Sequence, residues 1–515
     1  MARVKVAGVT LPLFSLRSEG DWGIGEIGAL GACAALLRRH GFSIVQLLPP
    51  HELARGETSP YGARTGFGLD PIYATVSALP DLDERDVARA LGDDGVRERD
   101  ALRALPGVDY ARVRTLKMRA LEAAFENFEE REWKRGTARA ARLRAFVARE
   151  ELWENDLSLY VALREEHGGT GWSTWPMSEK TRDPATLDDA RARLDARVRF
   201  HQYLQWQLFE QWDAARAAVE REGVQLYGDL PFVVGRESAD VWSCSRLFRQ
   251  DVDLGAPPDE FSATGQSWGL PAYDWAALEA EQHAWLRARA AHAARLYHGF
   301  RMDHVVGYFR QYVRKGEALG DFDPKDERDQ EAHGRRVLAA MRAAAQPASI
   351  IAEDLGVIPA FVRQTLADLE LPGYKIIPWE KEADETLRDP AAFPEISVAS
   401  YSTHDTPPLL AFFDSLPARD RTALAALAKT TEEAPEPERE RALLELLFSA
   451  RSSLAMVLVT EIFGERTRIN TPNSVGEQNW SYRLPAPLER LESDPRLRAR
   501  LEMLGALVRA SGRAG

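Results

Sequence analysis

The chain has 515 residues, of which 45% are hydrophobic and 28% charged, a balance typical of a globular protein that buries a large core behind a polar surface. Its 66 basic and 79 acidic residues give a formal net charge of -13, which disfavours a nucleic-acid-binding protein, because such a protein needs a basic surface to neutralise phosphates. No stretch approaches the roughly 18 apolar residues of a membrane-spanning helix, so we expect no association with a membrane.

The N-terminal segment does not have the pattern of a signal peptide. Its apolar stretch, residues 6–14, is interrupted by Pro12, and no small-residue cleavage site follows. The two cysteines, Cys33 and Cys244, offer neither a disulfide framework nor a thiolate metal cluster. We therefore predict a cytoplasmic protein.

Short apolar runs rich in β-branched residues recur along the chain between longer segments of helical periodicity, a pattern typical of βαβ units. Most of these runs are apolar in the middle, as strands covered on both faces must be. Eight runs are found, at residues 6–13, 43–48, 224–234, 300–305, 349–353, 374–378, 396–402 and 455–462. They predict an α/β fold, a (β/α)8 TIM barrel with large, mostly helical insertions between its strands.

The segment between the second and third runs is much too long for one crossover helix. It is dense in Arg, Ala, Leu and Glu, and long proline-free stretches at residues 116–132, 138–153 and 197–220 favour helix. We predict that residues 82–222 form a mostly helical insertion subdomain within a single catalytic unit spanning residues 1–515.

Three of the predicted strands end in acidic residues. Asp303 closes the fourth run in GFRMDH, Glu353 closes the fifth in AEDLG, and Asp405 follows the seventh in THDT. Active sites of such barrels lie at the carboxyl ends of the strands, where these three side chains would converge. Cleavage of a glycosidic bond with retention uses a nucleophile and a proton donor about 5 Å apart, and carboxylates suit both roles.

The local sequence gives two of these carboxylates different environments. Arg301 precedes Asp303 by two positions, so on a strand both side chains point to one face and the guanidinium keeps the aspartate ionised as a nucleophile. Glu353 follows the apolar residues 350–352, which favour a raised pKa and a protonated general acid. Alone, Arg301 and Asp303 could be a structural ion pair and Glu353 a helix cap, but three acidic strand ends at one point favour a site.

Longer motifs resemble those of the amylomaltases, or 4-α-glucanotransferases, of glycoside hydrolase family 77. The resemblance covers nearly the whole chain. Besides the three acidic motifs it includes SPY at 59–61, GDLP at 228–231, SADVW at 238–242, PPDEFSATGQSWG at 257–269, PAYDW at 271–275 and RINTPNSVGEQNW at 468–480.

The resemblance implies an activity and roles for the carboxylates. The protein would transfer α-1,4-glucan segments from a donor maltooligosaccharide to the 4-OH of an acceptor glucan or glucose, by a retaining double displacement and without a metal or other cofactor. Asp303 looks like the nucleophile, Glu353 like the acid/base, and Asp405 like the residue that stabilises the distorted transition state.

The resemblance also implies a set of substrate-binding residues. The rings of Tyr61 and Trp268 would stack on pyranose rings, and packing in the core is the alternative for both. On an ideal strand, the side chain of His304 should alternate away from that of Asp303. The set is Tyr61, Asp229, Trp268, Arg301, His304 and His404.

Three other functions remain open on the sequence. A retaining glucan hydrolase of the α-amylase type would use the same three carboxylates with water as the acceptor. A metal-dependent barrel hydrolase could recruit Asp229, His304, Glu353 and His404, but Arg301 would repel a divalent cation. A glucan-binding protein without activity would keep the tryptophans and would not need Glu353.

Overall fold

The computed structural model of the chain describes residues 4–54, 56–258, 265–316, 318–472, 474, 476 and 478–515. The middle of the PPDEFSATGQSWG motif, residues 259–264, lies outside the described residues.

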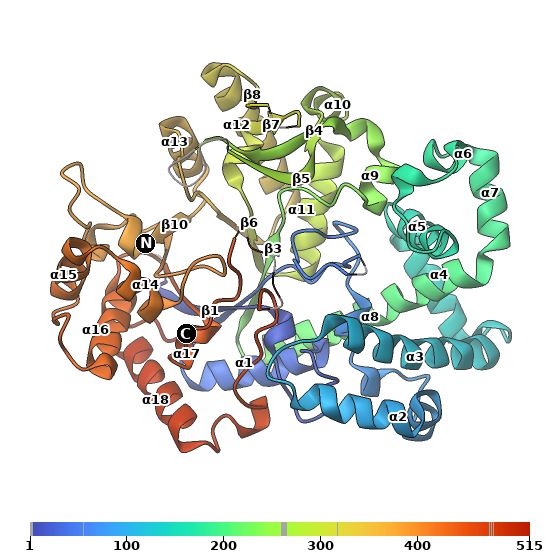
Figure 1. Cartoon of the computed structure of the whole chain (residues 1–515), viewed down its shortest axis with the longest axis horizontal. Coiled ribbons are helices and arrows are strands. Elements are labelled where there is room, and N and C mark those ends of the chain that lie inside the picture. The colour runs from blue at the N-terminus through green and yellow to red at the C-terminus, as the bar shows by residue number, and fades with distance from the viewer. Residues whose placement is uncertain are drawn as a thin grey trace.

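Eight parallel strands close into a barrel at the centre of the molecule (Figure 1), in the order β1-β12-β11-β10-β9-β6-β3-β2. Each strand falls on one of the eight apolar runs, so the predicted (β/α)8 barrel is confirmed. The strands are β1 (Val6–Leu11), β2 (Ile44–Leu47), β3 (Gln225–Leu230), β6 (Gly299–Met302), β9 (Ser349–Ala352), β10 (Gly373–Ile376), β11 (Ser397–Ser400) and β12 (Leu454–Leu458).

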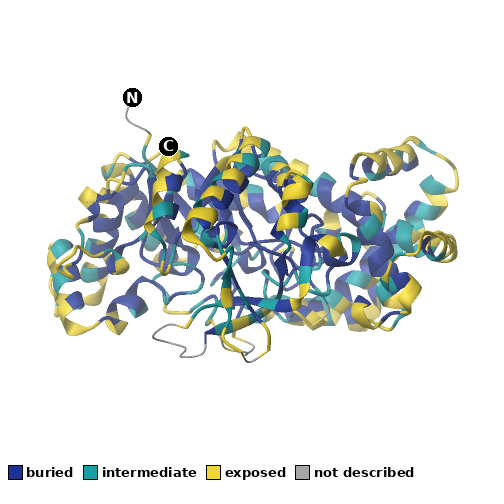
Figure 2. Ribbon diagram, turned by 90° about the horizontal axis from the view of Figure 1, so that it is seen from above, coloured by how far each residue is buried: buried dark blue, intermediate teal, exposed yellow. Residues whose placement is uncertain are grey.

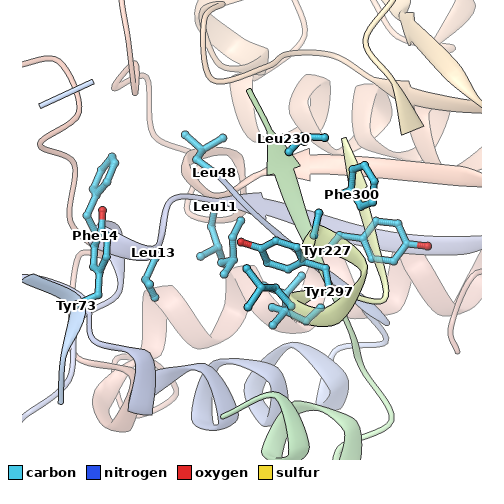
Figure 3. Packing of buried hydrophobic residues seen from close by; sticks show 14 of the residues in the cluster. Leu11, Leu13, Phe14, Leu48, Tyr73, Tyr227, Leu230, Tyr297 and Phe300 are labelled. Atoms are coloured by element: carbon cyan, nitrogen blue, oxygen red, sulfur yellow. The ribbon is translucent and has the colours of Figure 1, made fainter. Parts of the chain in front are cut away.

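β3 packs closely against the residue that leads into β6, its neighbour in the barrel. A Cβ atom on Gly228 would lie 2.3 Å from the ring of Tyr297, so only glycine fits there. Figure 3 shows Tyr227 and Tyr297 packed beside these two strands, together with other buried apolar side chains. In the resulting register Asp229 pairs with Arg301, which places a carboxylate next to a guanidinium on adjacent strands.

Helices cover the outside of the barrel. In α1 (Leu30–Arg39), Leu30, Cys33, Ala34 and Leu37 recur at helical spacing and are buried, as expected for a helix with one apolar face. The other helices outside the long insertion are α9 (Ala239–Ser243), α10 (Trp275–Ala280), α11 (Ala284–Leu296), α12 (Glu327–Ala344), α13 (Ala360–Asp368), α14 (Leu409–Ser415), α15 (Ala418–Leu427), α16 (Glu436–Ser449), α17 (Val459–Ile462) and α18 (Pro495–Ala510).

Among the described residues between β2 and β3, seven α-helices lie together on one side of the barrel, on the right in Figure 1. Several begin with a side chain that accepts a hydrogen bond from the first turn, such as Asp83, Asp109 and Thr137. Buried residues continue from the barrel into these helices (Figure 2), so both share one apolar core. The helices are α2 (Glu84–Ala104), α3 (Tyr110–Phe128), α4 (Ala138–Arg149), α5 (Glu154–Glu166), α6 (Met177–Lys180), α7 (Pro184–Arg193) and α8 (Asp195–Arg221).

A second, antiparallel sheet was not predicted from the sequence. Its strands are β4 (Phe248–Ala256), β5 (Gln266–Tyr273), β7 (Gln311–Arg314) and β8 (Asp321–Asp323), in the order β5-β4-β7-β8. They belong to the connections that follow β3 and β6, and they are short or only partly buried, so they lack the continuous apolar character of the barrel strands. The sheet carries Trp268 on β5.

No helix within the described residues combines the length and the apolar character needed to cross a membrane.

A buried ion pair joins three distant parts of the chain. Both Arg483 and Asp21 are almost inaccessible, and the Arg483 Nη2 atom lies 2.8 and 2.9 Å from the two carboxylate oxygens of Asp21. The Arg483 Nη1 atom donates to backbone carbonyls at the end of α2, those of Leu102, Arg103 and Leu105. The pair thus fastens the segment after β12 to the N-terminal loop and to the helical insertion.

We expect Asp21→Asn to lower the free energy of unfolding by about 3 kcal/mol, because it leaves the Arg483 charge buried without a counter-charge. Urea unfolding of the purified variant measures this. The control is Asp94→Asn, at an exposed aspartate that pairs with Arg97 one turn away, for which a change of at most about 0.5 kcal/mol is expected. Equal losses in the two variants would contradict a structural role for the buried pair.

Candidate active site

The three predicted carboxylates lie at the carboxyl ends of barrel strands. Asp303 directly follows β6, Glu353 directly follows β9, and Asp405 lies in the turn after β11. Asp229 is part of β3, one strand further around the barrel.

The guanidinium of Arg301 lies at the centre of the site. Its Nη1 atom is 2.6 Å from Asp303 Oδ1 and 2.9 Å from Asp229 Oδ2, and its Nη2 atom is 3.8 Å from Glu353 Oε2. Burial alone would lower the pKa of Arg301, but the surrounding carboxylates outweigh it and raise that pKa well above its ordinary value. One permanent cation therefore holds three acidic side chains together, and the expected contact between Arg301 and Asp303 is present.

Glu353 has the environment of a proton donor. Burial raises its pKa to about 7, against the attraction of Arg301 and with the help of the nearby Asp303 charge. The carboxylate accepts hydrogen bonds from the backbone N–H groups of Leu355, at 3.0 Å, and of His304, at 2.8 Å. A carboxyl group that is half protonated near neutral pH is suited both to give and to take a proton.

Asp405 is held in the ionised form by its neighbours. Burial raises its pKa, but His404 and Asn470 outweigh burial and bring that pKa well below its usual range. His404 Nε2 lies 3.2 Å from Asp405 Oδ2, and Asn470 Nδ2 donates to Oδ1 at 2.7 Å. Arg468 also donates, at 2.5 Å, to the backbone carbonyl of Asp405.

His404 and Tyr61 form a stacked pair beside these acids. The rings of Tyr61 and His404 lie 5.2 Å apart and nearly parallel, and the Tyr61 hydroxyl donates to Asp229 Oδ2 at 2.7 Å. Burial lowers the pKa of His404, but the charge of Asp405 and the contact with it raise the pKa overall. Burial, opposed by Arg301, raises the pKa of Asp229.

His304 and Trp268 form a second ring pair, next to Glu353. His304 has a left-handed backbone conformation, with φ of 46°, so the alternation expected for an ideal strand does not apply to it. Its ring contacts Trp268 edge to face at 5.0 Å. Burial, offset in part by Asp303, lowers the pKa of His304 to about 4, so the ring is neutral at neutral pH.

The structure brings together residues to which sequence reasoning gave no role. Asn470 and Arg468 reach Asp405 from the segment after α17, and Trp480 lies beside His404 and Tyr61. All three belong to the RINTPNSVGEQNW motif. The resemblance of this motif to the family was the one sequence signal that could have pointed to these residues.

A metal site at the barrel mouth is not supported. Among the described residues, the one group with three potential ligand atoms close together is Glu166, His167 and Glu179, in the helical insertion. Arg193 already lies 3.0 Å from Glu166, which disfavours a cation there. At the barrel mouth, the guanidinium of Arg301 already occupies the position between the acidic side chains, where a metal ion would have to bind.

Comparison with known proteins gives one consistent family. A family model described as 4-alpha-glucanotransferase matches residues 11–489. The chain is 31% identical over 493 residues to the 4-alpha-glucanotransferase of Aquifex aeolicus, covering 93% of this chain and 96% of that protein. It is also 31% identical over 502 residues to the 4-alpha-glucanotransferase of Thermus thermophilus, covering 94% and 96% respectively.

A solved structure supports the fold. The amylomaltase from Streptococcus agalactiae in complex with acarbose superposes with a TM-score of 0.85 at 24% identity, and the match covers 99% of this chain and 100% of that one.

The raised pKa of Glu353 predicts a pH dependence of stability. Folding moves this pKa from the ordinary 4.5 to about 7, so between these values the folded chain binds more protons than the unfolded chain and loses stability as the pH rises. Glu353→Gln removes this loss, and its stability relative to the original chain should increase by about 3 kcal/mol between pH 4.5 and pH 8.

Urea unfolding of both proteins across this pH range checks the prediction. The same exchange at the exposed Glu433 controls for the loss of one carboxylate. A stability difference that is independent of pH would show that Glu353 ionises at its ordinary pKa.

Proposed function

Because this chain belongs to the 4-alpha-glucanotransferase family, we propose that Asp303, Glu353 and Asp405 together carry out its transfer of α-1,4-glucan segments to the 4-OH of an acceptor glucan or glucose. The observation that supports these roles best is the position of Arg301, whose buried guanidinium contacts Asp303 and Asp229 and approaches Glu353.

Asp303 is the nucleophile in the first step. Its carboxylate attacks the anomeric carbon of the donor, the bond from that carbon to the glycosidic oxygen breaks, and Glu353 gives its proton to the departing 4-oxygen. The product is an ester between Asp303 and the glucan segment. The Nη1 atom of Arg301 lies 2.6 Å from Asp303 Oδ1 and so places a positive charge beside the attacking group.

The second step reverses the first with a new sugar. The Glu353 carboxylate takes the proton of an acceptor 4-OH, whose oxygen attacks the anomeric carbon and releases Asp303. Two inversions leave the α configuration unchanged. The raised pKa of Glu353, about 7, suits a group that must be an acid in one step and a base in the next.

Asp405 stabilises the transition state of both steps. Its pKa lies well below the usual range, so it is ionised where positive charge develops on the sugar ring. Asn470 and His404 each hold one of its oxygens, and this leaves remaining lone pairs for sugar hydroxyls.

The other residues of the site bind the sugar chain. Tyr61 and Trp268 supply aromatic surface for pyranose rings, while Asp229, Arg301, His304 and His404 supply polar contacts around the reacting sugar. Transfer instead of hydrolysis further requires that an acceptor reach the intermediate before water does. The relatives are 4-alpha-glucanotransferases, and they do not favour the alternative of an α-amylase-type hydrolase.

The substrates we propose are maltooligosaccharides and other α-1,4-glucans, without a cofactor and without nucleic-acid or membrane partners. The two free cysteines suit a cytoplasmic location, which also remains our proposal. We further propose that residues 1–515 act as one catalytic unit, within which residues 82–222 form a helical insertion subdomain.

We expect purified protein incubated with maltotriose alone to give glucose together with maltopentaose and longer chains, because glucan segments pass from one maltotriose to another. Chromatographic separation of the products by length over time measures this. Glucose and maltose alone, with net loss of glycosidic bonds, would instead identify a hydrolase. The same yields in the presence of a chelator would exclude a metal-dependent reaction.

We expect Asp303→Asn to lower the transfer rate at least ~10^3-fold with the fold intact, because the amide cannot form the ester intermediate. In Glu353→Gln the glucosyl ester should accumulate on Asp303 when the donor has a good leaving group, and peptide mass spectrometry locates it. Asp251→Asn, at an exposed aspartate on β4, is the control with unchanged activity. An adduct on any other residue would reject Asp303 as the nucleophile.

A further inference from the structure

Three aromatic rings from distant parts of the chain meet beside Asp405. The centroid of His404 lies 5.2 Å from that of Tyr61 and 5.8 Å from that of Trp480, and Tyr61 and Trp480 are 6.0 Å apart. Each ring therefore contacts the other two, and we refer to Tyr61, His404 and Trp480 as the ring cluster. Trp480 is 6% exposed, so its indole is enclosed by protein and has little surface left for a sugar.

The backbone of Trp480 is in a strained conformation held from two sides. Its φ of 61° lies in the left-handed region, which bulky side chains rarely adopt. Its N–H donates to the carbonyl of Ile469 at 2.8 Å, and its own carbonyl accepts from the hydroxyl of Tyr110 at 2.8 Å. Tyr110 is the first residue of α3, so the helical insertion fixes the position of an indole at the barrel mouth.

Neighbouring contacts fix the loop on both sides of Trp480. The side chain of Asn479 bonds to the backbone of Thr471 and of Ser474, and so ties the two ends of the turn together. Three residues further on, Arg483 pairs with Asp21 in the interior. Strain that is held by this many contacts marks a position where the side chain must point in one direction.

The direction of the Trp480 side chain matters because of the charges around His404. Burial and the positive charge of Arg301 disfavour the imidazolium of His404. Asp405, whose Oδ2 atom lies 3.2 Å from His404 Nε2, and the negative charge of Asp229 favour it. The ring of Tyr61 stacks on the imidazole, and the indole of Trp480 lies tilted against it at 42°. Aromatic faces carry negative potential, so they attract a positive ring and also exclude the water that would compete for Asp405.

We propose that Trp480 is a positioning residue which, together with Tyr61, keeps His404 as an imidazolium directed at Asp405. This inference rests on the proposed role of Asp405 in glucan transfer and deepens it. The indole does not touch the sugar. It acts through His404, which in turn fixes the charge and the orientation of the carboxylate.

The test measures the titration of His404 by NMR, with 13C-labelled histidine in the full chain and the signal assigned by its loss in His404→Gln. In Trp480→Leu, the midpoint should fall by about one pH unit, because a desolvated cation–π contact is of that size. Trp480→Phe keeps a ring and should give a smaller shift.

Transfer kinetics with maltotriose provide the second readout. A fall of one unit in the midpoint leaves about tenfold less imidazolium at high pH, so kcat should fall up to about tenfold there while KM changes little. The matched control is Trp175→Leu. Trp175 is a buried tryptophan 5.3 Å from His167 in the helical insertion, and its loss should leave both the His404 midpoint and kcat unchanged.

An unchanged His404 midpoint in Trp480→Leu would overturn the proposal, as would an equal shift in Trp175→Leu. If Trp480→Leu does not fold, Tyr110→Phe decides, since it removes one hydroxyl that holds the Trp480 backbone: a lowered midpoint supports the proposal and an unchanged one overturns it. The NMR titration needs no turnover. A chain without transfer activity would therefore refute the proposed function and still leave this inference testable.

Discussion

The buried guanidinium of Arg301 is the constraint on which the rest of the site depends. Negative partners stabilise a cation that has almost no access to water, and Asp229, Asp303 and Glu353 provide them from three adjacent barrel strands. The cation opposes the effect of burial on the pKa values of Asp229 and Glu353, which burial raises. The strand pairing that aligns Asp229 with Arg301 is therefore part of the chemistry as well as of the fold.

Asp405, the catalytic carboxylate outside the ion pairs of Arg301, is held by different means. Asp405 lies beyond the end of β11, and its partners Asn470 and Arg468 come from the described segment 465–470, which belongs to no helix or strand. That segment is fixed in turn by the helical insertion, through Tyr110, and by the buried pair of Arg483 with Asp21. Barrel strands thus position one half of the site, and contacts between insertion and loop position the other half.

This division explains what could be predicted from the sequence. The barrel strands are apolar runs buried on both faces, so all eight could be located, and a spacing of two on a strand was sufficient to pair Arg301 with Asp303. The left-handed turn at His304, the path that brings Trp480 to His404, and the small antiparallel sheet depend on contacts between distant segments. No local pattern of residues specifies such contacts, and propensity alone does not predict them.

The pairing of Asp21 with Arg483 spans 462 positions of the chain, and β1 completes the barrel by pairing with β12, the last of the eight barrel strands. During synthesis, Asp21 and the helical insertion leave the ribosome long before their partner Arg483 does. Asp303, Glu353 and Arg301 emerge while the barrel is still open. The sheet of the nascent chain therefore stays open, and Asp21 stays without Arg483, until the segment after β12 has left the ribosome. Catalytic competence would then appear late, after β12 has closed the barrel against β1 and the segment that follows β12 has completed the surroundings of Asp405.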